Sequence, residues 1–243
     1  LMIKKLIILF KLGRKVASSD ILNIVSKFKE PPLAIKILFK MLSFSFSPKK
    51  QVDANKDEGE RLSNSLESMG TTFIKLGQFL ATRPDIIGEE LSKKLENLQD
   101  KLPPFSLIQA KEIIKNDLGN EGYDSIINLS EPVAAASIAQ VHKAQINDNG
   151  VLKDVAIKIL RPNIKKIFNE EIDAIMLFAF LIESFIKKTK RLKLVEVVFL
   201  LKEITNLEMD LRFEAAAANE YAENTKNDVG FRVPQIYWNY TSE

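Results

Sequence analysis

A β-hairpin pattern between two long helical patterns is the feature that most constrains how this chain folds. Residues 138–146 have strand character, Asn147-Asp148-Asn149-Gly150 is a strong turn signal, and Val and Ile recur at every second position over 155–160. Apolar residues recur every three or four positions before this hairpin and again after it. Helices, a hairpin and then helices predict an α+β fold.

The remaining elements are predicted from the same spacing and from the Pro and Gly residues that interrupt it. The helical patterns cover residues 61–84, 88–100, 106–117, 164–189 and 194–224. The closing segment, 230–240, predicts a further strand pair with a turn near Pro234. Residues 51–60 are polar and unpatterned, and they predict a linker between residues 1–50 and the first helix.

The composition excludes several kinds of site. The 243 residues include no cysteine, which rules out disulfides, thiolate zinc sites and cysteine nucleophiles. The single histidine, His142, argues against a histidine metal site and against a Ser-His-Asp triad, so we expect no metal ligands here. No apolar run reaches the roughly 18 residues that a membrane-spanning helix needs.

Basic residues gather in the first fifth of the chain. Residues 1–50 hold 11 Lys/Arg against two acidic side chains, whereas the other 193 residues hold 24 basic and 30 acidic ones. The segment is also rich in Ile, Leu and Phe, and this combination is typical of peripheral binding to an anionic membrane surface. The alternative is a helix that packs Leu33, Ile37 and Met41 on its own domain. Nucleic acid is not an expected partner, because no aromatic residues are interleaved for base stacking.

A strand lysine is the first candidate for chemistry. Alternation places Ala156 and Lys158 on the same face of their strand. The lysine can then reach phosphates, while the small alanine leaves room for a flat base. The alternative is an edge lysine that faces water.

The segment upstream of this lysine lacks the glycines of a phosphate-binding loop. It consists of Ala134, Ala135, Ala136 and Ser137. Glycine would allow positive φ and close approach to phosphates, so an alanine loop should be stiffer and contact them differently. Backbone N–H groups and the Ser137 hydroxyl could still donate. The alternative is a loop whose alanines only pack closely.

Two further polar groups stand out on the predicted helices. Lys75 and Gln78 share a helix face, with Gly77 mid-helix, where glycine usually marks a close approach of another element. Later, Glu208, Asp210 and Glu214 form an acidic edge beside a run of alanines, and in a kinase-like lobe a helix glutamate holds the strand lysine. Either group, taken alone, is compatible with an ordinary solvated helix face.

In combination these motifs resemble the UbiB/ADCK family of atypical kinase-like proteins, and most closely its bacterial UbiB branch. The supporting stretches are Lys75-Leu-Gly-Gln78 with "FLATRPDIIGEELSKKLENLQDKLPPF", Pro132 with "AAASIAQVH", then "VAIKILRP" and "EMDLRFEAAAAN". The similarity runs from about residue 55 to residue 243. It implies a helical extension with the Lys-x-Gly-Gln motif (61–125) and a kinase-like N-lobe (126–243), which follow the basic apolar membrane-associating segment (1–50) and the linker (51–60) that composition and pattern predict.

The resemblance implies a role for each candidate residue. Lys158 matches the nucleotide-phosphate lysine and Glu214 its glutamate partner, and these are the expected catalytic residues. The alanine-rich segment, with Ala156 and Lys158, is the expected cofactor-binding set for ATP or ADP with Mg²⁺. The Lys-x-Gly-Gln motif and the Glu208/Asp210 acidic motif are the expected regulatory elements. The first is expected to lie over the nucleotide pocket, with a Lys75–Glu208 ion pair.

The resemblance also implies a cellular role. The family supports ubiquinone biosynthesis, including its ring hydroxylation steps, and we expect a peripheral position on the cytoplasmic face of the bacterial inner membrane. The expected partners are a nucleotide, the anionic membrane surface, isoprenoid quinone precursors and other ubiquinone-biosynthesis proteins.

The sequence departs from the family in one respect. Complete members continue into a larger C-lobe that supplies the catalytic-loop aspartate and asparagine, the Asp-Phe-Gly magnesium ligand and C-terminal membrane helices. None of these occurs in residues 1–243. We therefore expect a fragment or split reading frame that is inactive alone, with the Mg²⁺ ligands in the missing C-lobe. The alternatives are a non-catalytic membrane-associated scaffold and a helical lipid-binding protein.

Overall fold

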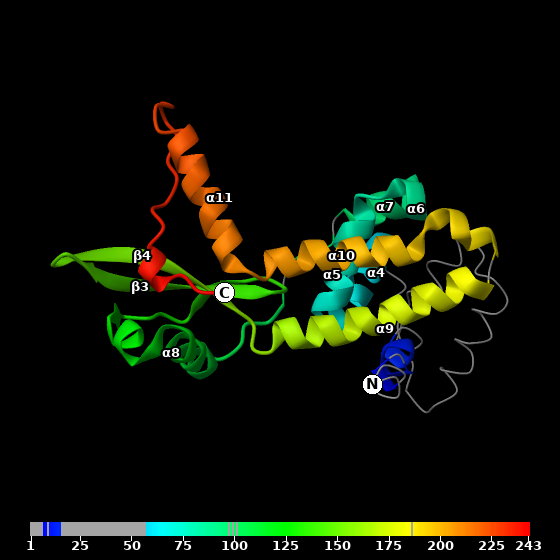
Figure 1. The fold of residues 1–243 in the computed structure, drawn as a ribbon, viewed down its shortest axis with the longest axis horizontal. Helices are drawn as coiled ribbons and strands as arrows, with labels where there is room; N and C mark the ends of the chain where they lie inside the picture. The colour runs from blue at the N-terminus through cyan, green and yellow to red at the C-terminus, as the bar shows by residue number, and fades with distance from the viewer. Residues whose placement is uncertain are drawn as a thin grey trace. The chain divides into compact units, whose positions relative to one another are not determined.

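The computed structural model describes residues 7–8, 10–15, 57–96, 98, 100, 102–185 and 187–243. The chain divides into two units, each made of two separate stretches. A helical unit combines Leu1–Leu102 with Lys166–Lys202, and a sheet unit combines Pro103–Lys165 with Glu203–Glu243. Helices and an antiparallel sheet occur together, as the α+β prediction requires (Figure 1).

The helical unit is built around one apolar core. Its elements are α4 (Glu58–Met69), α5 (Thr71–Ala81), α6 (Pro84–Ile87) and α7 (Glu89–Leu95), with most of α9 (Ile164–Phe185), the 3-10 helix η1 (Lys187–Leu192) and most of α10 (Leu194–Glu208). The core consists of Leu12, Leu62, Leu66, Met69, Phe73, Ile74, Leu91, Leu95, Leu98 and Ala174. The stripe predicted over 61–84 therefore does face a core.

The predicted helix over 61–84 is wrong in one respect, because Gly70 divides it into α4 and α5. Gly70 has φ of 100°, which no helical residue adopts, and its N–H donates to the carbonyl of Glu67. The apolar spacing continues across the break from Met69 to Phe73, so periodicity alone could not reveal it.

Polar contacts join α9 to its neighbours within the helical unit. The Thr72 hydroxyl of α5 donates to Glu171 of α9 at 2.5 Å. The ammonium group of Lys202 on α10 lies 2.8 Å from Asp173, and the two helices run side by side (Figure 1). The first contact ties residues 166–202 to α5, and the second ties α9 to α10 within that stretch.

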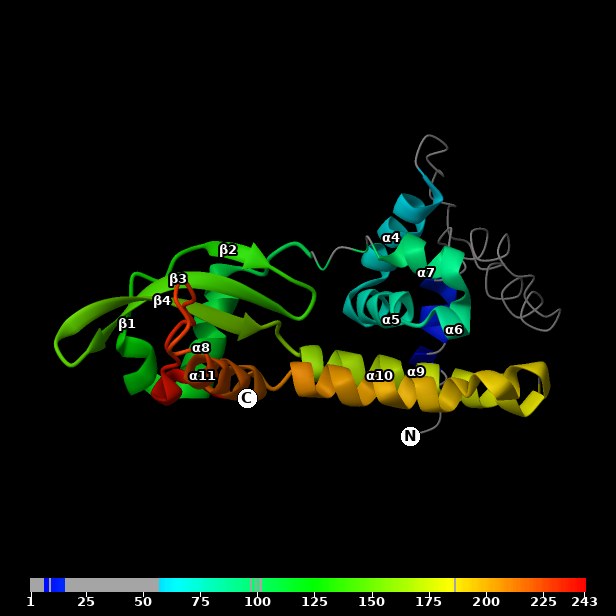
Figure 2. The same ribbon diagram turned by 90° about the horizontal axis from the view of Figure 1, so that it is seen from above.

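The sheet unit places one helix against an antiparallel sheet. Its elements are α8 (Leu107–Asp124), β1 (Ile126–Ile127), β2 (Pro132–Ala135), β3 (Ala139–Asp148), β4 (Val151–Leu160), α11 (Leu211–Asn224) and the 3-10 helix η2 (Trp238–Tyr240). Strand β3 pairs along its whole length with β4, and along separate parts with β1 and β2 (Figure 2). Ala110 and Ile114 of α8 pack on Ile159 of β4.

Two expectations about the last third of the chain are wrong. The helix predicted over 194–224 is two helices, because the chain leaves the helical conformation at Asp210, which caps α11. The strand pair predicted over 230–240 is absent from the described residues, which form only η2 there. Phe231 instead packs edge-on against Tyr221 of α11, with ring centroids 5.3 Å apart, so this segment contacts the helix at Phe231.

The two units also differ from the predicted limits at residues 61–125 and 126–243. Helix α8 belongs to the sheet unit because it covers the sheet, and residues 166–202 belong to the helical unit because Ala174 enters its core. Most of the basic segment 1–50 lies outside the described residues. Within its described part, Leu12 is buried in the helical core, and Lys15 donates to the carbonyl of Met69 at 3.1 Å.

Candidate functional site

The strand lysine and the helix glutamate meet in the sheet unit. Lys158 Nζ donates to Glu214 Oε2 at 2.5 Å. Ala156 and Lys158 are exposed along β4, while Ile157 is half-buried and Ile159 is buried, so the alanine and the lysine share the open face. Because the two charged side chains remain 37% and 59% exposed, their attraction adds little to stability, and it mainly orients the lysine.

Glu214 is presented by the first turn of α11, whose start is fixed by a charged cap. The Asp210 carboxylate accepts from the Arg212 N–H at 3.1 Å and from its guanidinium group at 2.9 and 2.7 Å. These hydrogen bonds from Arg212 lower the pKa of Asp210 to about 2, and Lys165 adds a smaller electrostatic contribution. Arg212 also bonds Glu243 at 2.9 Å. The cap therefore stays ionised at neutral pH and holds the start of α11.

The acidic motif occupies the break between α10 and α11 and does not lie on one continuous helix. Met209 is fully buried, and Glu208 beside it is exposed. The side chain of Asp210 is only 14% exposed because it turns back onto α11. The two carboxylates of the motif therefore have different tasks, since that of Asp210 is used as a helix cap.

The alanine-rich segment is partly strand and partly turn. Ala134 and Ala135 pair with β3, and the Ala136 N–H donates to the Ala139 carbonyl at 2.8 Å. Ser137 is fully buried. The Ala136 N–H is therefore used within its own turn and the Ser137 side chain is enclosed, while the cofactor-binding role of the segment remains a prediction.

Arg161 holds the alanine-rich segment, and sequence reasoning missed it. Its guanidinium donates twice to the Ala136 carbonyl, at 3.0 and 2.7 Å, and once to the Pro103 carbonyl at 2.9 Å. Its backbone N–H donates to the Ile138 carbonyl at 2.9 Å. The available signal was its place directly after the lysine strand, where a forked donor can reach the neighbouring turn.

Sequence reasoning also missed a buried chain of hydrogen bonds on β3, the Gln140–His142 relay, which links Phe105, Gln140, His142 and Ser130. Gln140 pairs with the backbone of Phe105 through two bonds, accepting from its N–H at 2.9 Å and donating to its carbonyl at 3.1 Å. His142 Nδ1 lies 2.8 Å from the Ser130 carbonyl, and its Nε2 lies 2.9 Å from the Gln140 amide nitrogen. A carbonyl can only accept, so Nδ1 carries the proton and Nε2 accepts. Gln140 and His142 are two positions apart and therefore share one face of β3, and this spacing was the available sequence signal.

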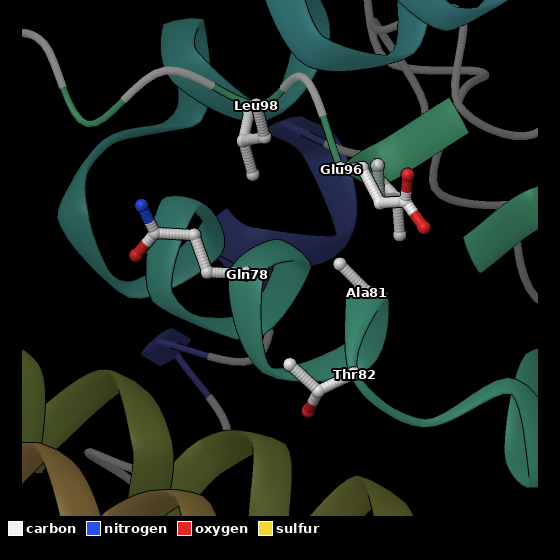
Figure 3. A pocket seen from close by; sticks show the side chains of 6 residues that line it. Gln78, Ala81, Thr82, Glu96 and Leu98 are labelled. Carbon is white, nitrogen blue, oxygen red and sulfur yellow. The ribbon is translucent and has the colours of Figure 1, made fainter. Parts of the chain in front are cut away.

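The Lys-x-Gly-Gln motif lies on α5 in the helical unit. A Cβ at Gly77 would lie 2.6 Å from Leu98 and 2.8 Å from Leu66, so the predicted close approach is present and only glycine fits without movement. Gln78 projects at the rim of an open cavity of about 420 Å³, whose other lining residues are Ala81, Thr82, Leu95, Glu96 and Leu98 (Figure 3). Lys75 belongs to the helical unit and Glu208 to the sheet unit, and their ion pair remains a prediction.

The described residues also bear on metal binding and on membrane crossing. No group of three or more His, Asp or Glu side chains among them could hold a metal ion. Among the same residues, no helix has both the length and the apolar character required to cross a bilayer.

Comparison with known proteins agrees with the motifs. Residues 97–243 match the ABC1 atypical kinase-like domain family. The "Probable protein kinase UbiB" of Marinobacter nauticus is 36% identical over 213 residues, which cover 87% of this chain and 38% of the relative. Its namesake in Cellvibrio japonicus is 35% identical over 211 residues, 86% of this chain and 37% of the relative. That of Azotobacter vinelandii is 34% identical over 216 residues, 88% of this chain and 39% of the relative.

The sequence identities and the shares of each chain that are matched define both the relationship and its extent. The chain spans less than two fifths of the length of each of these three relatives. The domain match covers more than half of the chain and includes Lys158 and Glu214. The chain therefore belongs to the ABC1 atypical kinase-like family and is similar to the UbiB proteins within it.

Proposed function

We propose that the sheet unit binds the phosphates of ATP or ADP with Mg²⁺, and that the chain is part of an atypical kinase or ATPase-like protein that supports ubiquinone biosynthesis. The observation that carries this proposal is the Lys158–Glu214 contact of 2.5 Å beside Ala156 on the open face of β4. A kinase-like lobe requires a strand lysine held by a helix glutamate. The names of the relatives support the pathway.

Each residue of this site has a distinct proposed task. The Lys158 ammonium group neutralises nucleotide phosphates, and Glu214 keeps the long lysine side chain in the orientation that reaches them. Ala156 leaves room for the base beside the lysine. Bound Mg²⁺ would neutralise the phosphates further.

The alanine-rich segment is proposed to restrict how phosphates are held. The N–H of Ala136 is used within its own turn, and its carbonyl is held by Arg161. This turn therefore offers fewer free donors than a glycine-rich loop, and its backbone is less able to rearrange. We expect an altered nucleotide preference and restrained phosphoryl transfer, and an Ala135→Gly change should alter nucleotide affinity.

The regulatory residues complete the proposal. Lys75, Gly77 and Gln78 are proposed to cover the nucleotide pocket, and Glu208 and Asp210 to face them. The close packing of Gly77 and the capping of α11 by Asp210 support rigid presentation of both motifs. A covered pocket would favour ATP hydrolysis or a small acceptor over a protein substrate.

Nucleotide binding can be measured directly on a protein that consists of residues 1–243. Isothermal titration with ATP and ADP, each with Mg²⁺, should give saturable binding that Lys158→Ala weakens by about tenfold or more, since a hydrogen bond to a charged group contributes about 1.5–3 kcal/mol. Lys153→Ala is the matched control, because it removes the same charge from an exposed position of the same strand. Glu214→Gln should weaken binding less than Lys158→Ala.

The same titration separates this function from the scaffold and lipid-binding alternatives. Equal affinities in Lys158→Ala, Lys153→Ala and the unaltered chain would exclude the proposed site. Circular dichroism of each variant shows whether a loss of binding reflects a loss of fold. Phosphoryl transfer by a whole protein of this family is a further proposal, because the relatives are more than twice as long as their matched parts.

We also propose a peripheral position at the cytoplasmic face of the inner membrane, close to the ring hydroxylation steps of the pathway. The 11 Lys/Arg among residues 1–50 support it. Removing the whole segment would also remove Leu12 from the helical core, so the test should replace Lys36, Lys40, Lys49 and Lys50 by Gln. Loss of co-sedimentation with anionic vesicles would support the location, and unchanged co-sedimentation would contradict it.

A further inference from the structure

A cleft in the helical unit gathers cations beside an apolar wall, and the proposed nucleotide site does not use it. Its volume is about 320 Å³, within the range of about 300–1,000 Å³ that is usual for small-molecule sites. The charged residues that line it are Arg83, Asp85, Arg191, Lys193 and Glu196. They come from the start of α6, the end of η1 and the start of α10, all within one unit.

Two of the three cations are already paired within the cleft. Arg83 makes a bidentate contact with Asp85, from Nε at 2.8 Å and from Nη2 at 2.7 Å. Lys193 donates to both oxygens of Glu196, at 3.1 and 3.0 Å. Arg191 is exposed, and its side chain forms no hydrogen bond or ion pair with any residue that the structure describes. The lining therefore carries one uncompensated positive charge, and it lies on Arg191.

The surrounding sequence strengthens this positive field. The described side chains close to Arg191 in the sequence include Lys190 and Lys193, and residues 190–193 contain no carboxylate. The beginning of α10 does not supply the attraction, because the N–H of Val195 already donates to Glu183 at 3.2 Å. Side chains, and Arg191 first among them, would therefore recognise an anion here.

The remaining lining favours a ligand that is more than an inorganic anion. It consists of Ile86, Leu192, Val197 and Leu200. Val197 is buried, whereas Leu200 is 43% exposed, so part of this apolar wall faces water in the open cleft. A ligand with an apolar body beside its charge would cover that surface.

We propose that this cleft binds an amphiphilic phosphate, a phosphate monoester or diester joined to a short apolar body. Arg191 is the principal phosphate-binding residue, because the parallel N–H donors of a guanidinium group match two phosphate oxygens. Arg83, fixed by Asp85, presents its remaining N–H groups from α6. The apolar body lies on Val197 and Leu200.

The test titrates ¹⁵N-labelled residues 1–243 with monomeric dihexanoylphosphatidylglycerol, dihexanoylphosphatidylcholine and inorganic phosphate. The anionic lipid should give saturable amide shifts at residues 83, 191 and 193, with affinity about tenfold or more above that of either other probe. The zwitterionic lipid has the same apolar body without net charge, and phosphate has the charge without the body. An affinity for inorganic phosphate equal to that for the anionic lipid would overturn the role of the apolar wall.

Two matched substitutions distinguish a built site from general attraction. Arg191→Gln should lower the affinity by about tenfold or more, and Arg191→Lys should restore part of it. Lys190→Gln removes the same charge one residue away, outside the lining, and should change the affinity less than twofold. Equal losses in Arg191→Gln and Lys190→Gln would refute the proposal. Lys158→Ala should leave this binding unchanged, so failure here is distinguishable from failure of the nucleotide site.

Discussion

The Gln140–His142 relay makes a strong prediction about the stability of the sheet unit. His142→Leu removes the donor to the Ser130 carbonyl and leaves one N–H of the buried Gln140 amide without its acceptor. A buried group without a partner costs about 1–3 kcal/mol, so we expect a loss of this size. Gln140→Leu should cost more, because it removes both bonds to Phe105 and leaves Nε2 of the fully buried His142 without a donor.

The double variant tests whether the two side chains act together. Both single substitutions break the same His142–Gln140 bond, so the loss in the double variant should be about 1 kcal/mol or more below the sum of the single losses. Urea unfolding followed by the fluorescence of Trp238 measures these losses, because Trp238 is the single tryptophan and belongs to the sheet unit. Losses that add to within about 0.3 kcal/mol would refute the relay.

Two further predictions concern the helical core and the cap of α11. Gly77→Ala should lower the free energy of unfolding by about 1 kcal/mol, because its Cβ would displace Leu66 and Leu98. The overpacking costs about 1–3 kcal/mol, whereas the gain in helix propensity is about 1 kcal/mol. Urea unfolding followed by far-UV circular dichroism measures the change, and a gain in stability would contradict the prediction. The pKa of Asp210, lowered to about 2, predicts a contribution to stability that is complete above the ordinary value of 3.8 and is lost as the pH falls through 2. Arg212→Gln should raise that pKa toward 3.8, and an unchanged midpoint in a ¹³C carboxyl NMR titration would show that Arg212 is not the cause.

The sequence predicted the elements whose signals are local. The hairpin turn at Asn147–Gly150 is where it was expected, because each strand shows alternation and the turn residues are specific. The breaks at Gly70 and Asp210 were missed because apolar spacing continues through both. The closing strand pair was wrong because alternating residues can pack on a helix as well as on another strand, and Phe231 does so.

The site shows the same division between local and distant information. Alternation along β4 was enough to place Ala156 beside Lys158. The contact with Glu214 joins positions 56 apart, so its prediction depended on family resemblance. The relay to Phe105 crosses 35 positions and could not be found, since no periodicity within one segment reports which other segment it will meet.

The division of each unit into two stretches has a consequence for synthesis on the ribosome. Ala174 belongs to the core that α4, α5 and α7 line, and the Thr72–Glu171 bond joins positions 99 apart. The first helices therefore emerge long before the partners that complete their core, and the whole hairpin is made in the interval. Closing so long a loop is slow and leaves apolar surface exposed meanwhile. We expect the nascent helical unit to be the part of this chain that most needs protection from aggregation.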